Sequence, residues 1–341
     1  MFEIMEKTLL VNTPYISHTP ESSFLFSILQ NIPTSDEWIC SRLLSMVVRK
    51  ENVHDEFSMI GKYYEECPFI HIVSVRDEII KNVFTLSFSD CIEKAINNGY
   101  YVSAIVNTKH INSYENRSGF WHHIHIYGYS TTEQTVFIAD HFKKGHFTFE
   151  KCTYSEINRS RDLVDTFVAF VKLLPDVRFD LTSETMVSLI QEHINGENLF
   201  TKNNIVNPIY PEDPNDSCFF GLRYYDCLIE ILRGGRFPYK RPIVLIYEHT
   251  KILKMLLTII QRKYVPNIAH LFYLCDDLIK KAELLKYYYI KVQIINHFNE
   301  ADYNIIQNDE QKKKIIELLL SVKEKERNLL ENILVILDAV K

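Results

Sequence analysis

Two short runs of residues, 121–129 and 136–140, place the strongest constraint on how this chain can fold. Each run reads as a β-strand, and a short connection joins them. Adjacent antiparallel strands bring residues side by side, so His122 in the first run and Asp140 at the end of the second are expected within hydrogen-bond reach. A histidine oriented by an aspartate supplies two members of a nucleophilic triad, and the nucleophile must come from another part of the chain.

The first run contains three histidines, which alternate between the two faces of the expected strand. Period-two alternation puts His122 on one face and His123 and His125 on the other. Two histidines on the same face could hold a metal ion, but no third ligand lies at a usable spacing. We therefore expect no metal site and no resident cofactor.

Helical patterns come first and extended patterns follow within residues 1–170. A capped helix is expected after Pro20, where serines precede the apolar residues 24–29. The other expected elements are helices over residues 37–48 and 88–97 and strands over residues 69–75, 100–106 and 146–149. This order predicts an α+β domain, residues 1–170, in which a helix packs on an antiparallel sheet.

Residues 171–341 are expected to form an all-helical second domain, apart from a loop at 203–216 and a Gly/Pro break at 234–238. The clearest helix covers residues 311–340, where apolar residues recur at helical spacing opposite lysines and glutamates. Such a stripe belongs to a core or to a dimer face, so a homodimer is one possibility.

Composition and charge exclude several classes of protein. The net charge is −6 without a dense Lys/Arg run, which argues against a nucleic-acid partner. No apolar run approaches the roughly 20 residues that a spanning helix needs, and the acidic start is neither a signal peptide nor a membrane anchor. The seven scattered cysteines, none spaced as Cys-x-x-Cys, predict reduced thiols and a cytoplasmic location.

Several segments of the chain resemble a known family. The segments are residues 100–106, 122–129, 137–140 and 147–157. They are similar to the butirosin-biosynthesis acyltransferase N-terminal family, a papain-like group related to the peptidases that process bacteriocin leader peptides. Residues 219–226 and 247–249 resemble parts of longer members, so the resemblance extends over most of the chain. It implies a papain-like cysteine-peptidase fold for the first domain.

The resemblance also implies a reaction and its partners. Such bacterial proteins act in non-ribosomal peptide or polyketide biosynthesis, and transfer an acyl group from the phosphopantetheine arm of an acyl or peptidyl carrier protein to a small-molecule amine. The acyl group passes through a thioester on the enzyme and ends in an amide. Here His122 would be the base and Asp140 its orienter. Carrier proteins are acidic, so a basic cluster around a Gly/Pro turn is either a docking surface or a solvated loop: Arg233, Arg236, Lys240 and Arg241.

The sequence departs from the family at the nucleophile. The family cysteine aligns with Pro20, which cannot attack, and Cys40 lies well beyond this position. A shift of a few residues offers Ser22 or Ser23, although serine at a helix start is usually a cap. His18 nearby is expected to be a solvated loop residue.

Three hypotheses follow from this departure. The chain is an acyltransferase in which a serine replaces the thiol, in a Ser-His-Asp triad. Alternatively, it is a catalytically degenerate binding or scaffold protein of the same pathway. The third hypothesis is a peptidase with the same machinery.

Overall fold

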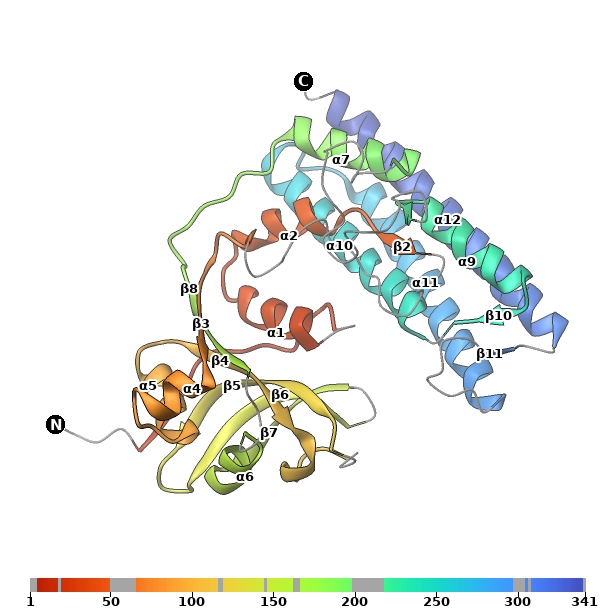
Figure 1. Cartoon of the computed structure of the whole chain (residues 1–341). Helices are drawn as coiled ribbons and strands as arrows, with labels where there is room; N and C mark the ends of the chain where they lie inside the picture. The colour runs from red at the N-terminus through yellow and green to blue at the C-terminus, as the bar shows by residue number, and fades with distance from the viewer. Residues whose placement is uncertain are drawn as a thin grey trace. The chain divides into compact units, whose positions relative to one another are not determined.

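The computed structural model gives the arrangement of most of the chain (Figure 1). The described residues are 5–17, 20–49, 66–115, 119–143, 146–161, 166–197, 218–238, 240–296, 304–305 and 308–339. His18 and the loop expected at 203–216 lie outside these ranges.

The chain divides into two compact units. Unit 1 comprises Met1–Ser35 and Tyr63–Arg178, and unit 2 comprises Asp36–Lys62 and Phe179–Lys341. The boundary expected near residue 170 therefore falls inside unit 1. In addition, Asp36–Lys62 groups with the second half of the chain. Within this range β2 (Val47–Arg49) pairs with β9 (Cys218–Phe220).

Unit 1 is built on a seven-stranded antiparallel sheet, which with its helices makes the fold α+β as expected. Its main strands lie in the order β3 (Ile70–Arg76), β8 (Phe167–Leu173), β4 (Tyr101–Asn107), β5 (Trp121–Ser130), β6 (Thr135–Lys143) and β7 (His146–Thr153). The strand β8 ends at Leu173, which corrects the expectation that helical structure begins at residue 171. Its residues are almost all apolar, and such a run does not distinguish a strand from a helix.

The strand β5 is paired along its whole length. Its first half lies beside β4, with His122 opposite Val106, and its second half lies beside β1 (Glu6–Thr8). On its other side β5 pairs with β6, with His125 opposite Ala139 and a shift in register between Ile126 and Gly128. This central position fixes which side chains of β5 point to each face.

Different helices cover the two faces of the sheet (Figure 1). On one face, α4 (Asp77–Asn82), α5 (Phe88–Asn97) and α6 (Tyr154–Arg159) contribute to an apolar core that contains Ile124 and Ile126 of β5. On the other face lies α1 (Pro20–Leu29), where the Phe24 ring stacks on His125 at 4.2 Å between centroids. Both faces of β5 are therefore buried.

Local sequence explains where α5 forms. Ser87 and Asp90 make a reciprocal capping box at its start, and the buried residues recur at helical spacing from Phe88 to Ile96. After the helix, Gly99 adopts a φ of +80°, which a glycine reaches without strain. The structure confirms the helix expected over residues 88–97.

Unit 2 is mainly helical. Its helices are α2 (Ser35–Leu43), α7 (Ser183–Asn195), α9 (Arg223–Arg233), α10 (Arg241–Lys263), α11 (Ala269–Ile295) and α12 (Asp309–Asp338). Ser35, the first residue of α2, belongs to unit 1. It is not all-helical, because β2 pairs with β9 and β10 (Arg236–Phe237) pairs with β11 (Asn304–Ile305). The helix expected over residues 37–48 ends at Leu43, since Val47 and Val48 are β-branched and enter β2.

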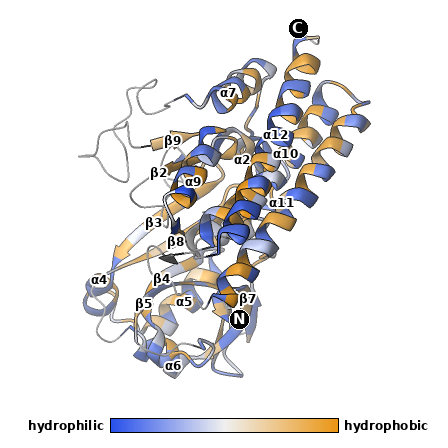
Figure 2. Cartoon of the chain, turned by 90° about the vertical axis from the view of Figure 1, so that its right-hand side faces the viewer, coloured by the Kyte–Doolittle hydropathy of each residue, from blue (hydrophilic) through white to orange (hydrophobic). Residues whose placement is uncertain are grey.

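The apolar stripe of α12 lies in the core of unit 2. Figure 2 shows apolar and polar residues alternating around the long helices. The stripe residues are almost fully buried within this chain: Ile315, Leu319, Val322, Leu329, Ile333 and Leu337. The stripe therefore belongs to the core rather than to a dimer face. Within the described residues, no helix has both the length and the apolar character needed to cross a membrane.

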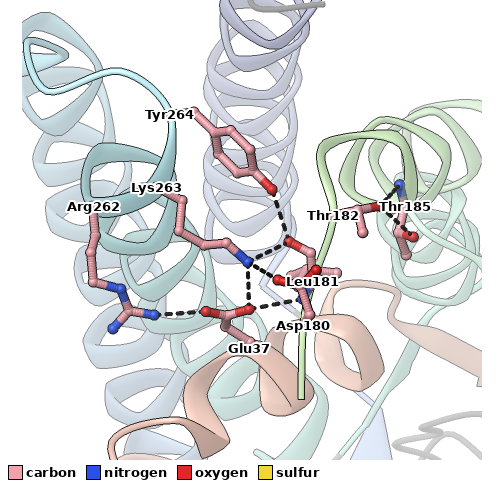
Figure 3. A network of polar contacts seen from close by, with 8 residues as sticks. All are labelled: Glu37, Asp180, Leu181, Thr182, Thr185, Arg262, Lys263 and Tyr264. Carbon is pink, nitrogen blue, oxygen red and sulfur yellow. Dashed lines mark hydrogen bonds and ion pairs between the residues drawn. The ribbon is translucent and has the colours of Figure 1, made fainter. Parts of the chain in front are cut away.

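A buried carboxylate joins three parts of unit 2 (Figure 3). Glu37 of α2 accepts hydrogen bonds from Arg262 at 2.9 Å and from Lys263 at 2.8 Å, both at the end of α10. It also accepts one from the backbone amide of Leu181, at 2.8 Å, just before α7. The same Lys263 donates to the Leu181 carbonyl at 3.1 Å. Glu37 thus fixes the ends of two helices against a third.

We expect Gly128→Ala to weaken the attachment of β1 to β5. A Cβ atom at Gly128 would lie 2.7 Å from the Lys7 carbonyl oxygen and 2.6 Å from the Phe137 ring, so the backbone of β1 must move. Overpacking of this kind costs about 1–3 kcal/mol in the free energy of unfolding. Faster hydrogen exchange at the Leu9 amide, which bonds the Tyr127 carbonyl, would report the change. Gly234→Ala is the control, since its nearest atom is 3.4 Å away.

Replacing Glu37 by alanine is expected to cost about 1–3 kcal/mol more than replacing it by glutamine, because only glutamine leaves an acceptor for the buried Leu181 amide. Urea-induced unfolding of both variants measures the difference. The control is Asp276→Asn, which breaks a half-exposed pair with Lys254 and should cost less than about 1 kcal/mol. Equal losses in the two Glu37 variants would contradict the role given to the Leu181 bond.

Candidate functional site

The structure brings His122 and Asp140 together in unit 1. The Nε2 atom of His122 lies 3.0 Å from Oδ2 of Asp140. The Asp140 side chain is fully buried, whereas 25% of the His122 side chain is exposed. The pair forms because Ala139 lies opposite His125, so alternation puts the next residue, Asp140, on the face of β5 that carries His122. A partly accessible imidazole held by a buried carboxylate is an arrangement suited to general-base chemistry.

A tyrosine that the sequence analysis did not select completes this group. The Tyr114 hydroxyl donates a short hydrogen bond to the same Oδ2 atom of Asp140. Its ring also packs edge-on against His122, with centroids 5.9 Å apart, and Phe120 packs against the imidazole in the same way. The backbone amide of Asn112 donates to Glu156 at 3.0 Å, which holds the loop that carries Tyr114.

The electrostatics of the group keep Asp140 charged. Burial alone would raise the pKa of Asp140, but the hydrogen bond from His122, the nearby His141, the His122 charge and the Tyr114 hydroxyl together hold that pKa below its ordinary value. Burial, reinforced by the Asp140 charge, raises the pKa of Tyr114, so this phenol stays a hydrogen-bond donor. The carboxylate can therefore stabilise an imidazolium at His122.

A second histidine touches Asp140 from the neighbouring position on β6. The Nδ1 atom of His141 lies 3.5 Å from Oδ1 of Asp140. Its Nε2 atom lies 2.7 Å from the Ser17 carbonyl oxygen, and since a carbonyl only accepts, Nε2 carries the hydrogen. His141 thus connects Asp140 to the segment that precedes α1.

The two candidate nucleophiles lie elsewhere. Ser22 and Ser23 are fully buried in the first turns of α1, the helix that packs on the His125 face of β5. His122 points to the opposite face, where it meets Tyr114 and Asp140. The structure therefore does not bring either serine to His122. The physical reason is the alternation of β5, which gives α1 the side chain of His125 instead.

The basic cluster surrounds β10 in unit 2. Arg233 and Arg241 are exposed, and Arg236 and Lys240 are partly buried. The seven cysteines all fall within the described residues, where none forms a disulfide, as the sequence predicts.

Unit 2 contains a second buried polar group, which the sequence analysis missed. His193 of α7, His249 of α10 and Glu326 of α12 each offer one ligand atom, and these atoms lie within 4.8 Å of one another. The Nε2 atom of His193 is 2.7 Å from Oε1 of Glu326, and Nδ1 of His249 is 3.5 Å from the same oxygen. These three side chains are the described residues that could hold a metal ion.

Two further contacts orient this second group. The Tyr225 hydroxyl of α9 donates to Oε2 of Glu326 at 2.5 Å, and Nε2 of His249 lies 2.8 Å from the Leu44 carbonyl. Burial lowers the pKa of His193 despite the opposing influence of Glu326. Burial would raise the pKa of Glu326, but the two imidazoles outweigh it and hold that pKa below its ordinary value.

Sequence signals for these additional residues were weak. Tyr114 follows a short 3₁₀ turn (Thr108–His110) in a loop, where no periodicity indicates its direction. His193 and Glu326 are 133 residues apart, so no local spacing connects them. However, Tyr225 and His249 both lie in the segments selected by family resemblance, 219–226 and 247–249, and the structure brings both onto Glu326.

No family model and no curated protein matches this chain.

We expect Asp140→Asn to remove a pH-dependent part of the stability of unit 1. The pKa of Asp140 is lower in the folded protein than the roughly 3.9 of an unfolded aspartate, so its contribution is present above about pH 4 and is lost as the pH falls below that value. At pH 7 the substitution should cost about 1–3 kcal/mol, because it weakens the bonds from His122 and Tyr114.

Hydrogen exchange of β5 and β6 amides between pH 7 and pH 3 measures this effect. The difference between wild type and variant should shrink as the pH falls. Asp176→Asn, which replaces an exposed carboxylate of the same unit, controls for the loss of one charge. A difference that stays constant over the whole pH range would show that the contribution of Asp140 to stability does not depend on its charge.

Proposed function

We propose that this chain is an acyltransferase in which His122 acts as the general base and Asp140 as its orienter. The observation that carries the proposal is the contact of 3.0 Å between a partly exposed imidazole and a fully buried carboxylate. A base needs access to substrate, while its orienting acid needs a fixed and desolvated position. The neighbouring Phe120 and Trp121 side chains are exposed and offer an apolar surface beside the imidazole.

The reaction is proposed as direct transfer from a thioester to an amine. Because Nε2 of His122 donates to Asp140, the base is proposed to be the other ring nitrogen, Nδ1. This atom takes a proton from the amine as nitrogen attacks the thioester carbonyl. The new C–N bond forms, the C–S bond breaks, and the thiolate leaves with the proton returned by the imidazolium. The products are an amide and a free thiol, and no acyl group is placed on Ser22 or Ser23.

The donor and its setting are proposed from the family resemblance. The thioester would be carried on the phosphopantetheine arm of an acyl or peptidyl carrier protein, in natural-product biosynthesis. The basic cluster around β10 would attract the acidic carrier. Cysteines without disulfides suit a cytoplasmic location. A papain-like origin is supported by a helix on an antiparallel sheet with His and Asp on adjacent strands, although the helix lies on the other face from this pair.

A second function is favoured by one specific observation. Ser22 and Ser23, which lie close to the position of the family nucleophile, are both fully buried. A papain-like protein without an accessible nucleophile would bind an acyl chain or a carrier protein without reacting with it. Under this alternative His122 and Asp140 only stabilise the sheet.

Amide formation from an acyl-pantetheine thioester and a panel of primary amines distinguishes the two functions. We expect turnover by the wild type, a loss of about 10²-fold or more with His122→Ala, and a smaller loss with Asp140→Asn. His146→Ala, which removes an exposed histidine from the same sheet, is the matched control and should keep full activity.

Intact-mass spectrometry on the same reactions tests the route. No acyl adduct is expected on the protein. An adduct that disappears in Ser22→Ala or Ser23→Ala would overturn direct transfer and establish an acyl-serine. Binding of the thioester without turnover, unchanged in His122→Ala, would overturn the acyltransferase and favour the binding protein.

A further inference from the structure

The buried group in unit 2 places two hydrogen-bond acceptors close together. The Leu44 carbonyl can only accept, so Nε2 of His249 carries a hydrogen. In a neutral imidazole the other nitrogen, Nδ1, is then a lone pair. That lone pair lies 3.5 Å from Oε1 of Glu326, which is an acceptor as well. Two acceptors therefore face each other in a buried site, with no hydrogen between them.

The second imidazole approaches the same oxygen. Nε2 of His193 lies 2.7 Å from Oε1, so two ring nitrogens converge on one carboxylate oxygen. The rings are stacked, with centroids 5.0 Å apart and planes 10° from parallel. All three side chains are almost fully buried, and the Nδ1 atoms of both histidines have no hydrogen-bond partner among the described residues.

A buried carboxylate is costly unless charged or hydrogen-bonding groups compensate it. The contact between Nδ1 of His249 and Oε1 of Glu326, at 3.5 Å, is long for a charge-assisted hydrogen bond. A cation between the three ligand atoms would instead satisfy all of them together.

We propose that His193, His249 and Glu326 bind a divalent transition-metal ion, with Zn²⁺ the best fit. Zinc lies about 2.0–2.2 Å from nitrogen and oxygen ligands, so tetrahedral ligand atoms are about 3.3 Å apart. The separations of 2.7 and 3.5 Å bracket this value. Two imidazoles and one carboxylate suit zinc, whereas Mg²⁺ and Ca²⁺ take oxygen ligands.

The surrounding contacts fit metal ligands. The Leu44 carbonyl accepts from Nε2 of His249 and directs Nδ1 to the metal, and the Tyr225 hydroxyl holds the other oxygen of Glu326. With Nε2 of His193 on the metal, its hydrogen moves to Nδ1. Gly221, just before α9, packs against the backbone of His193 in α7. A Cβ atom at Gly221 would clash with the His193 carbonyl oxygen, so only glycine allows this close approach.

The role inferred for the ion is to hold α7, α10 and α12 together, because each helix supplies one ligand. The site is buried, which favours a structural ion over a catalytic one. Metal binding then contributes directly to the stability of unit 2. This inference is independent of the acyltransferase proposal, since the site shares no residue with His122 and Asp140.

Metal content and affinity test the inference on the full chain, purified with a tag that does not bind metals. After treatment with a chelator, the protein is titrated with Zn²⁺ or with Co²⁺, whose visible absorption reports nitrogen and oxygen ligands. We expect one equivalent per chain and a higher melting temperature with metal. Tyr225→Phe changes a residue that contacts a ligand, and it should lower the metal affinity about 10- to 100-fold. His249→Gln and Glu326→Gln change the ligands themselves and should lower the affinity by more than this.

Two controls keep the test decisive. His270→Gln removes an exposed histidine of unit 2 and should bind metal as the wild type does. X-ray absorption of the wild type with zinc gives the ligand set even if a variant fails to fold, and two imidazoles with one carboxylate are expected. Failure of the wild type to retain Zn²⁺ or Co²⁺, or equal retention by His249→Gln and Glu326→Gln, would overturn the site.

Discussion

The arrangement of unit 1 depends on the burial of both faces of β5. A strand with one solvated face can place polar side chains outward, but here every second residue meets a different set of helices. The direction of each histidine is then decided by its position alone. His125 goes to α1, where it stacks on Phe24, and His122 goes to the face of Tyr114 and Asp140. A shift of one residue in the register of β5 would turn each of its side chains to the other face of the sheet. His122 would then face α1, and His125 would face the side of Asp140.

Each unit surrounds a buried carboxylate with the same kinds of side chain. Asp140 and Glu326 each meet two imidazoles and one tyrosine hydroxyl. A fully desolvated carboxylate is costly with a single partner, and each of these two carboxylates has several polar groups around it. The difference lies in access. In unit 1 one imidazole is partly exposed, whereas in unit 2 both imidazoles and the carboxylate are buried.

How far the sequence predicts the molecule depends on how local each signal is. Helix α5 and the adjacency of His122 and Asp140 follow from caps, periodicity and strand pairing within short segments. By contrast, β8 is apolar on both faces, and its pattern is shared with a buried helix. The histidines and the glutamate of unit 2 meet only through tertiary packing. Ser22 and Ser23 were predicted to lie near His122 because they stand at the start of a helix. A capping residue indicates where a helix begins, but it does not indicate which face of a sheet the helix covers.

The path of the chain between the units has a consequence for biosynthesis. It leaves unit 1 after Ser35, contributes Asp36–Lys62 to unit 2, and returns before the remaining strands of the sheet are made. On the ribosome, Trp38 and Cys40 of α2 emerge early, yet Cys40 contacts the carbonyl of Ile252, which is translated 212 residues later. The sheet can form before the helices that cover the apolar side chains of α2 have been synthesised. The apolar side chains of α2 are therefore exposed to solvent for most of the synthesis of the chain. Chaperones that bind such exposed side chains prevent aggregation in this state.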